Sequence, residues 1–384
     1  MINEDKIATL NLHYIITSQM IRKEGKIMES LFIIYTPYQL LSALNIIKQY
    51  NEKNYKIILV HPNMKKFINL FYENKDNFVL LDNLYNQNNY RNKYFAHIKI
   101  VSGLVSQKKI IKDNIYLWKN VNRIYVPSDE IICRLIYKYV KLENREIVLN
   151  LIDDGNGTYV RKISDEKGMI SKLFFSVFMD AGYFDKLNTI YCYHPELLKV
   201  NNQKVKIRKI QMNYEIVNCI KQQIKEASIL YLNRKVIFLD QGKDDAYIKN
   251  SIKIVSKYFS DEEIIVKKHP RLESSISYNG FVISDDKLPI ELILSILNVR
   301  DCLIISHSST GNITPYLINN IMPWSIMLFK MDFDQNTINN EILNFIKEIN
   351  GNIGYEYIRS PATLVEFEKI LIKIKNEVKP ITLM

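Results

Sequence analysis

The chain has 384 residues, of which 47% are hydrophobic and 24% charged, and this composition excludes a largely disordered protein. Lys and Arg outnumber Asp and Glu by 52 to 41, which gives a formal net charge of +11. The surplus serves general solubility and also favours anionic partners such as nucleotide sugars, acidic glycans or a membrane surface. The basic residues are scattered and no nucleic-acid-binding motif stands out, so nucleic acid is not an expected partner.

The length fits two domains rather than one. No apolar run approaches the roughly 18 to 20 residues that a membrane-spanning helix needs. Residues 1–27 lack the apolar segment of a secretory signal, and we expect an N-terminal extension there, with Met28 as an alternative start. The four cysteines are far apart in apolar contexts, which indicates buried free thiols in a reducing cytoplasm.

Strand-like and helix-like segments alternate along the first half of the chain. Strands are predicted at residues 31–35, 56–60, 79–81, 123–126, 147–152 and 187–193, and helices at 39–49, 94–111, 130–140 and 172–179. This alternation predicts a mostly parallel sheet with helices on both faces. An amphipathic helix at 214–228 follows, and we place the domain junction within residues 200–233.

A second alternating series begins at residue 235. It has predicted strands at 235–239, 264–267, 280–283, 302–305 and 325–329, and predicted helices at 245–259, 289–297, 312–321 and 361–378. The expected fold is therefore α/β, with two Rossmann-like domains that face each other across a cleft. We assign residues 28–215 to the first domain and 216–384 to the second.

Three polar clusters lie where predicted strands end, and ligands in open α/β sheets bind at the carboxyl ends of strands. The clusters are Asp153-Asp154-Gly155, Lys267-Lys268-His269-Pro270-Arg271 and Ser306-His307-Ser308-Ser309-Thr310-Gly311. Together they indicate a cleft enzyme that breaks a sugar–phosphate bond.

His269 is the candidate acid, because an imidazole among cations suits a phosphate-bearing leaving group. Proline is also common where a strand ends, because it cannot continue the hydrogen-bond ladder. We interpret His61-Pro62 and His194-Pro195 as such structural strand ends. The basic neighbours of His269 and its place shortly before the serine cluster distinguish it.

The loop from Ser308 to Gly311 offers hydroxyls, backbone N–H groups and the start of a helix, which are the donors that a phosphate needs. The same residues would also make an ordinary helix N-cap. We favour phosphate binding because the loop should lie beside His269 in a doubly wound sheet.

Two acidic pairs are candidates for the general base that an acceptor hydroxyl requires. Asp153 and Asp154 precede Gly155 in a sequence that also reads as a turn, and Asp244 and Asp245 also suit a helix N-terminus. No glycine-rich dinucleotide motif, Walker loop, zinc spacing or Asp-x-Asp triplet is present, so we expect chemistry without a metal or cofactor.

These motifs together resemble a known family. Thr36-Pro37-Tyr38-Gln39 is similar to the TPxQ start of glycosyltransferase family 52, which includes bacterial lipooligosaccharide and capsule sialyltransferases. Asp153-Asp154-Gly155 resembles the acidic-acidic-Gly motif of bacterial sialyltransferases, Lys268-His269-Pro270 their His-Pro motif and Ser308-Ser309 their paired serines. The matches run in the expected order over residues 31 to 315.

The resemblance implies a GT-B-like fold and an inverting, metal-independent transfer of sialic acid from CMP-sialic acid to a hydroxyl of a glycan or glycolipid. By that resemblance His269 is the acid, and Ser308 and Ser309 hold the CMP phosphate. Related families place the base at Asp154 or Asp153, whereas family 52 places it some two dozen residues before the His-Pro motif. Asp245 and Asp244 precede His269 by 24 and 25 residues, and we rank Asp154 first.

Other functions remain open at this point. The enzyme alternatives are a polysialyltransferase, another family 52 sugar transferase and a teichoic-acid-type glycerol- or polyol-phosphate transferase. The non-enzymatic alternative is a basic protein that binds a membrane or glycan. We expect a cytoplasmic protein that associates peripherally with the inner face of the membrane, and the sequence does not decide whether it forms a homodimer.

Overall fold

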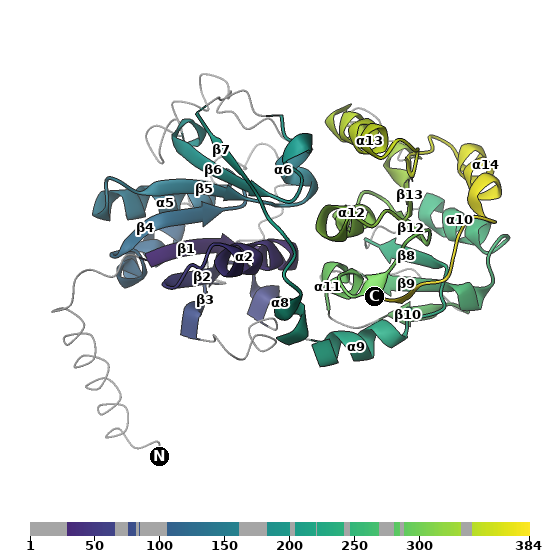
Figure 1. The fold of residues 1–384 in the computed structure, drawn as a ribbon, viewed down its shortest axis with the longest axis horizontal. Coiled ribbons are helices and arrows are strands. Elements are labelled where there is room, and N and C mark those ends of the chain that lie inside the picture. The colour runs from purple at the N-terminus through teal and green to yellow at the C-terminus, as the bar shows by residue number, and fades with distance from the viewer. Residues whose placement is uncertain are drawn as a thin grey trace, which may run out of the picture.

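The computed structural model describes residues 29–65, 76–81, 84, 106–160, 183–199, 204–219, 221–241, 246–268, 280–284, 288–331 and 340–384. The chain forms two lobes, each built on a parallel sheet, that lie side by side (Figure 1). The predicted extension at 1–27 and helix at 172–179 lie outside the described residues, as do four predicted site residues: Asp244, Asp245, His269 and Pro270.

The described part of the first lobe contains a seven-stranded parallel sheet with the order β3-β2-β1-β4-β5-β6-β7. Its strands are β1 (Glu29–Ile34), β2 (Tyr55–Leu59), β3 (Phe78–Leu80), β4 (Val121–Val126), β5 (Val148–Ile152), β6 (Leu187–Cys192) and β7 (Lys206–Lys209). The strands before β4 are added on one side of β1, and β4 and the later strands on the other side. Open α/β sheets bind ligands at such a switch in strand order.

The described part of the second lobe contains a six-stranded parallel sheet with the order β10-β9-β8-β12-β13-β14. Its strands are β8 (Val236–Asp240), β9 (Ile264–Lys268), β10 (Val282–Ser284), β12 (Leu303–Ser306), β13 (Trp324–Met327) and β14 (Ile358–Arg359). Two short strands, β11 (Leu297–Asn298) and β15 (Thr382–Leu383), pair antiparallel beside this sheet and fix the C-terminal segment to the second lobe.

Helices flank both sheets. The α-helices are α2 (Pro37–Gln49), α5 (Ile131–Glu143), α6 (Asn156–Val160), α8 (Tyr214–Cys219), α9 (Lys221–Ile229), α10 (Ala246–Val255), α11 (Ile290–Leu294), α12 (Thr314–Asn319), α13 (Asn340–Ile353) and α14 (Leu364–Ile374). The 3-10 turns are η2 (Pro62–Met64), η5 (Ile115–Leu117), η6 (Phe184–Lys186), η7 (Pro195–Leu197), η8 (Asp261–Glu263), η9 (Thr310–Asn312) and η10 (Leu328–Met331).

The two lobes share apolar packing. Helices α2 and α6 of the first lobe face α11, α12 and α13 of the second (Figure 1). Tyr159 of α6 stacks on Phe345 of α13, with ring centroids 5.5 Å apart and planes 6° from parallel. The largest apolar core cluster therefore continues from the first sheet into residues of α12 and α13, including Leu317 and Ile349. This shared core fixes how the carboxyl edges of the two sheets face each other.

The strands predicted from apolar runs are present, with ends that differ by a few residues, so the predicted α/β fold is confirmed. The predicted helix at 214–228 appears as α8 and α9, the one at 289–297 ends at Leu294, and of the one at 94–111 only residues 106–111 are described, as helix. The sequence prediction missed β7, α6, α13, β14 and the β11–β15 pair. The proposed boundary at residues 215 and 216 falls within α8, and it stays a prediction.

Candidate active site between the two sheets

Asp153 lies directly after β5, and its side chain is fully buried. Its Oδ1 accepts hydrogen bonds from the Gly155 N–H at 2.8 Å and from the Tyr38 hydroxyl at 3.2 Å. Its Oδ2 accepts from the Tyr193 N–H at 3.1 Å and from the Tyr159 hydroxyl. Both oxygens are thus occupied by donors from its own lobe, which makes Asp153 a buried anchor of the turn.

Burial raises the pKa of Asp153 above its usual range, against four hydrogen bonds that lower it. Burial also raises the pKa values of Tyr38 and Tyr159 well above normal, so both phenols stay protonated and act as donors. The Asp153 carboxyl is therefore held by fixed donors inside the lobe.

Asp154 differs from its neighbour because its side chain is only half-buried. Its Oδ1 accepts a hydrogen bond from the Gln39 side-chain amide, and its backbone N–H donates to Thr158 Oγ1 at 2.6 Å. A Cβ atom at Gly157 would lie 2.7 Å from Asp154 Oδ2, so the absence of a side chain there leaves room for the carboxylate. Asp154 is thus oriented but not enclosed.

The predicted Thr36-Pro37-Tyr38-Gln39 motif begins α2 and holds both carboxylates. Thr36 caps the helix by accepting the Gln39 N–H at 3.3 Å, and Pro37 occupies the first turn. Gln39 Oε1 accepts the backbone N–H groups of Tyr35 at 2.7 Å and Thr36 at 3.2 Å, which directs its amide nitrogen at Asp154. Successive residues of this motif, Tyr38 and Gln39, therefore bind the successive acids Asp153 and Asp154.

Gly155 brings the acidic turn against the second lobe. Its φ is +75°, a conformation that favours glycine. A Cβ atom at this position would lie 2.5 Å from Thr310 Cγ2, so the Gly155 backbone and the Thr310 side chain pack directly together. Two of the three clusters singled out from the sequence, one from each sheet, meet at this contact.

The serine loop follows β12 and leads into η9 and α12. Ser309 caps η9, since its Oγ accepts the Gly311 N–H at 3.1 Å, and its own N–H donates to Ser306 Oγ at 2.9 Å. The Ser308 N–H donates to Gln241 Oε1 at 2.8 Å. Asn312 is buried below the loop and its Nδ2 donates to the Ile304 carbonyl at 3.0 Å, which ties the loop to the sheet.

These contacts decide which donors the loop can offer a phosphate. The backbone N–H groups of Ser308, Ser309 and Gly311 already have partners in the protein. Hydroxyls are therefore the main donors left, on Ser308, Ser309 and Thr310. Gly311 has a packing role, because a Cβ atom there would lie 2.9 Å from Leu239 Cδ1. The capping role that the sequence offered is thus present at Ser309, and the phosphate-binding role stays a prediction.

The carboxyl edge of the second sheet carries the third cluster. Lys268 is the last residue of β9 and pairs in register with Asp240, the last residue of β8. Strand β8 lies between β9 and β12, and neighbouring strands are about 4.8 Å apart, so the ends of β9 and β12 are about 10 Å apart. The strand that leads to His269 and the strand that leads to Ser308 thus end at the same edge.

The sequence analysis gave no role to three further residues that lie at the site. Gln241 follows β8 and holds the Ser308 backbone, and the buried Asp240 precedes it. The His307 Nδ1 lies 3.1 Å from Ser308 Oγ. All three lie at or directly after the end of a buried strand, which is the signal in the sequence that could have identified them.

His194, interpreted as structural from its His-Pro pair, lies where the lobes meet. Its Nδ1 is 2.6 Å from Glu196 Oε1 and its Nε2 is 3.2 Å from the Tyr316 carbonyl oxygen. Its ring also stacks on the Tyr316 ring, with centroids 4.5 Å apart. The buried imidazole therefore joins η7 of the first lobe to α12 of the second.

Among the residues that the structure describes, no group of three or more His, Cys, Asp or Glu side chains is placed to hold a metal ion. Over the same residues, no helix combines the length and apolar character needed to cross a membrane. The cysteines whose side chains the structure describes, Cys133, Cys192 and Cys302, are buried free thiols, as expected.

Comparison with solved structures places the fold among GT-B glycosyltransferases. The glycotransferase of kitacinnamycin aligns with a TM-score of 0.52 and 9% identity, and Arabidopsis thaliana UGT89C1 complexed with quercetin with a TM-score of 0.50 and 9% identity. Each alignment covers 91% of this chain and 90% of the other. At this identity the likeness shows the fold alone, and it confirms the predicted GT-B architecture.

An aspartokinase from Rickettsia prowazekii matches over 130 residues at 28% identity, which is 33% of this chain. The chain spans only 28% of the length of that curated relative. So short a match says nothing about the activity of this chain.

A family model matches residues 30–322, which is well over half of the chain. The model is described as "Alpha-2,8-polysialyltransferase (POLYST)". The resemblance to sialyltransferases is thereby confirmed at the level of a sialyltransferase family, while family 52 itself stays a prediction. Family and fold agree on a glycosyltransferase. The chain belongs to the alpha-2,8-polysialyltransferase family.

Proposed function

We propose that the chain transfers sialic acid from CMP-sialic acid to a hydroxyl of a cell-surface glycan, with inversion at the anomeric carbon. One observation carries the proposal: the acidic turn of the first lobe packs directly against the hydroxyl loop of the second, through Gly155 and Thr310. This contact supports a candidate base and candidate phosphate ligands that lie close together where the lobes meet.

In this proposal Asp154 is the base. Its half-buried carboxylate is held by Gln39 and can take the proton of the acceptor hydroxyl as that oxygen bonds to the anomeric carbon. Asp153 is a poorer base because four donors occupy its two oxygens. Asp244 and Asp245 remain the alternative candidates.

The leaving group is the phosphate of CMP, and the bond from its oxygen to the sugar breaks as the new bond forms. We propose that Ser308 and Ser309 donate their hydroxyls to this phosphate, with Thr310 and Gly311 shaping the loop. His269, flanked by Lys268 and Pro270, supplies the proton or the hydrogen bond that the departing oxygen needs. The closeness of the ends of β9 and β12 supports this pairing.

The family match favours a polysialyltransferase over an enzyme that adds one residue, because the matched family is defined by alpha-2,8-linked polymers. We propose an acceptor that already carries sialic acid, in a capsule or lipooligosaccharide pathway. The net charge of +11 suits such an anionic acceptor, and it suits a cytoplasmic enzyme at the inner face of the membrane.

A panel of donors and acceptors tests the proposal. The purified chain is incubated with CMP-sialic acid, CDP-glycerol or a UDP-sugar, and with acceptors that carry one to five sialic acids. We expect turnover only with CMP-sialic acid, at a rate that rises with acceptor length. Turnover of CDP-glycerol would instead favour the polyol-phosphate transferase, and equal rates at every acceptor length would favour single addition.

Titration with CMP separates the enzyme from a non-enzymatic glycan-binding protein. An enzyme of the proposed kind binds CMP saturably, and the Ser308→Ala/Ser309→Ala variant binds it more weakly. Binding only to acidic glycans or lipid, abolished by salt and unaffected by these substitutions, would contradict the proposal.

A further inference from the structure

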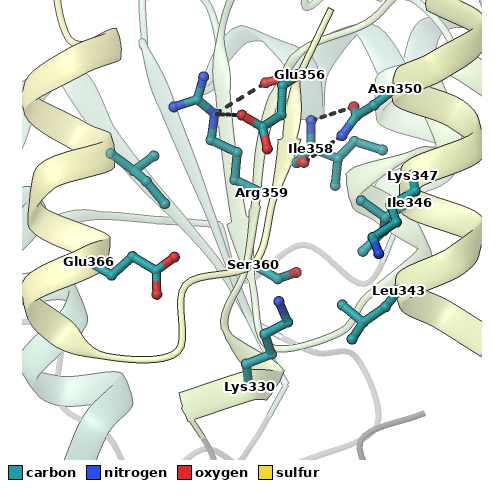
Figure 2. A pocket seen from close by; sticks show the side chains of 11 residues that line it. Lys330, Leu343, Ile346, Lys347, Asn350, Glu356, Ile358, Arg359, Ser360 and Glu366 are labelled. Atoms are coloured by element: carbon teal, nitrogen blue, oxygen red, sulfur yellow. Dashed lines mark hydrogen bonds and ion pairs between the residues drawn. The ribbon is translucent and has the colours of Figure 1, made fainter. Parts of the chain in front are cut away.

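A second pocket lies at the edge of the second lobe, outside the candidate active site. It has a volume of about 260 Å³ and is enclosed by α13, α14, η10 and the chain after β14 (Figure 2). The described residues that line it include both apolar and charged side chains. It lies at the carboxyl ends of β13 and β14, and the serine loop follows β12 at the same edge of the sheet.

Two lysines give the pocket its positive charge. Lys330 comes from η10 and Lys347 from α13, and Figure 2 shows both ammonium groups directed inward. Neither lysine has a carboxylate partner within salt-bridge distance among the described residues. The third cation, Arg359, is instead engaged by Glu356, since its Nε donates to the Glu356 carbonyl at 3.2 Å and lies 3.8 Å from Glu356 Oε2. An anion in this pocket would therefore meet two ammonium groups that are not already paired.

A hydroxyl between these lysines lacks a partner. The Oγ of Ser360 is buried and has no hydrogen-bond partner in the described part of the protein. Buried polar atoms in native proteins are nearly always hydrogen-bonded, so such an atom calls for an explanation. Figure 2 shows this hydroxyl facing the pocket beside the Lys330 ammonium group. A ligand oxygen would satisfy it.

The remaining walls suit a polyol rather than a bare ion. Glu366 lies across the pocket, and its Oε2 accepts the Ala362 N–H at 2.7 Å, which leaves acceptor capacity for a ligand hydroxyl. Leu343, Ile346 and Ile370 form an apolar surface beside these groups. A sugar ring presents this same combination of hydroxyls and C–H surface.

We propose that this pocket binds a monosaccharide-sized ligand that carries a carboxylate or phosphate group, with the anion on Lys330, Lys347 and Ser360. The site is independent of the CMP site proposed above. It adjoins the contact between the lobes, because α13 also carries Phe345, which stacks on Tyr159, and Glu348, which lies 2.5 Å from Lys199. A ligand bound here would therefore contact the helix that holds the first lobe.

Calorimetric titration of the full chain tests the proposal with four probes: glucuronate, glucose 6-phosphate, glucose and inorganic phosphate. We expect saturable binding of at least one of the two anionic sugars and none of glucose. The preferred anionic sugar decides whether the natural ligand carries a carboxylate or a phosphate. Binding of neither, or inorganic phosphate binding as tightly as both, would overturn the proposal.

Matched variants locate the binding. Lys330→Gln/Lys347→Gln should weaken binding at least tenfold, whereas Lys369→Gln/Lys373→Gln, on the exposed face of α14, removes the same charge and should change it less than twofold. Ser360→Ala should weaken binding without lowering the Tm of the free protein, because the hydroxyl has no partner to lose. Equal loss in both double variants would show a nonspecific charge effect and contradict the site.

A last pair of measurements separates this proposal from the function proposed above. Ser308→Ala should leave binding of the anionic sugar unchanged, and Lys330→Gln/Lys347→Gln should leave CMP binding unchanged. If Ser308→Ala removes the sugar binding, the probe occupies the candidate active site and the second pocket is not its site.

Discussion

The two lobes meet with opposite chemistry. The acidic turn of the first lobe is held by side chains of its own lobe, and its buried carboxylate Asp153 accepts four hydrogen bonds. In the serine loop of the second lobe, the backbone N–H groups of Ser308, Ser309 and Gly311 are bonded within that lobe, and side-chain hydroxyls remain as donors. A turn held rigidly in the first lobe thus lies against a loop with rotatable hydroxyls in the second. This arrangement suits a fixed position for Asp154 and donors that can follow the growing charge of a leaving group.

The same contrast exists within the acidic turn, between two residues adjacent in sequence. Asp153 points into the lobe and is fully buried, whereas Asp154 is half-buried and held through one oxygen by Gln39. We infer that Asp153 contributes mainly to folding and Asp154 mainly to chemistry.

Asp154→Asn should have the largest effect. The substitution keeps the shape of the side chain and removes the base, so turnover should fall by about 10²- to 10⁴-fold. The free energy of unfolding should stay within about 0.5 kcal/mol, because a partly exposed side chain contributes little. Rate measurement with CMP-sialic acid, alongside chemical denaturation, checks both. Undiminished turnover would contradict Asp154 as the base and favour Asp245 or Asp244.

Asp153→Asn should give the opposite pattern. An amide in this position must place its NH₂ group against donors, so the protein should lose about 2–4 kcal/mol of unfolding free energy. Turnover per folded molecule should fall less than in Asp154→Asn. Denaturant titration with activity measured on the folded fraction distinguishes the two variants. A stable but inactive Asp153→Asn protein would reverse the assignment of the two acids.

Tyr159→Phe should destabilise the protein in a pH-dependent way. Burial raises the pKa of Asp153 and the Tyr159 hydrogen bond lowers it, so the native state binds this proton more tightly than the unfolded chain. The carboxyl's stabilising contribution is complete below the unfolded pKa near 3.9 and is lost as pH rises through the folded pKa. Without the Tyr159 hydrogen bond, more of this stabilising contribution is lost at high pH. The decrease in unfolding free energy caused by Tyr159→Phe should therefore grow with pH, to about 1.5–3 kcal/mol at neutral pH.

Tyr183→Phe is the matched control for that experiment. The Tyr183 hydroxyl is also buried but has no hydrogen-bond partner among the described residues. Its removal should cost nothing and show no dependence on pH. Unfolding of both variants at pH 4, 5.5 and 7 makes the comparison, and a cost for Tyr159→Phe that is constant with pH would contradict the role given to its hydroxyl.

Much of this arrangement could be read from the sequence, for physical reasons that differ between elements. Apolar runs such as residues 147–152 are buried on both faces of a parallel sheet, so they predict strands well. Strand β7 escaped prediction because its residues, Lys206–Lys209, are all exposed at a sheet edge and carry no apolar alternation. Strand β14 has only two residues, too few for any period.

The candidate site was predictable in its parts but not in its contacts. Short motifs at strand ends pointed to Asp154 and Ser308, since the carboxyl edge of a sheet collects such residues. No local pattern shows that Gln39 reaches Asp154, 115 residues away, or that Gln241 holds the Ser308 backbone. The roles of Asp153 and Asp154 also depend on burial, which a sequence of two identical residues cannot distinguish.

Ser308→Ala and Ser309→Ala should separate ligand binding from loop structure. Ser308 Oγ has His307 as its neighbour, and its loss should weaken CMP binding by about 10- to 100-fold with little effect on stability. Ser309 also caps η9, so its loss should additionally cost about 1 kcal/mol of unfolding free energy. Calorimetry with CMP and thermal denaturation check the pair. Equal stability of both variants would contradict the capping role.

Gly155→Ala is the most direct test of the contact between the lobes. Two penalties act at this position: a φ of +75°, and a Cβ atom that would lie 2.5 Å from Thr310 Cγ2. Gly354 has the same φ with nothing within 4 Å of its Cβ position, so Gly354→Ala measures the backbone penalty alone, about 1 kcal/mol. The excess cost at Gly155 then belongs to the contact.

Thr310→Ser removes the clashing methyl group and keeps the hydroxyl. In the Gly155→Ala background it should recover most of the excess cost, while in the Gly354→Ala background it should recover none. The coupling free energy from this double-mutant cycle, of about 1 kcal/mol, measures how firmly the acidic turn and the hydroxyl loop are pressed together in solution. No coupling would mean that the lobes do not meet through these residues, and that the base and the phosphate ligands do not share one cleft.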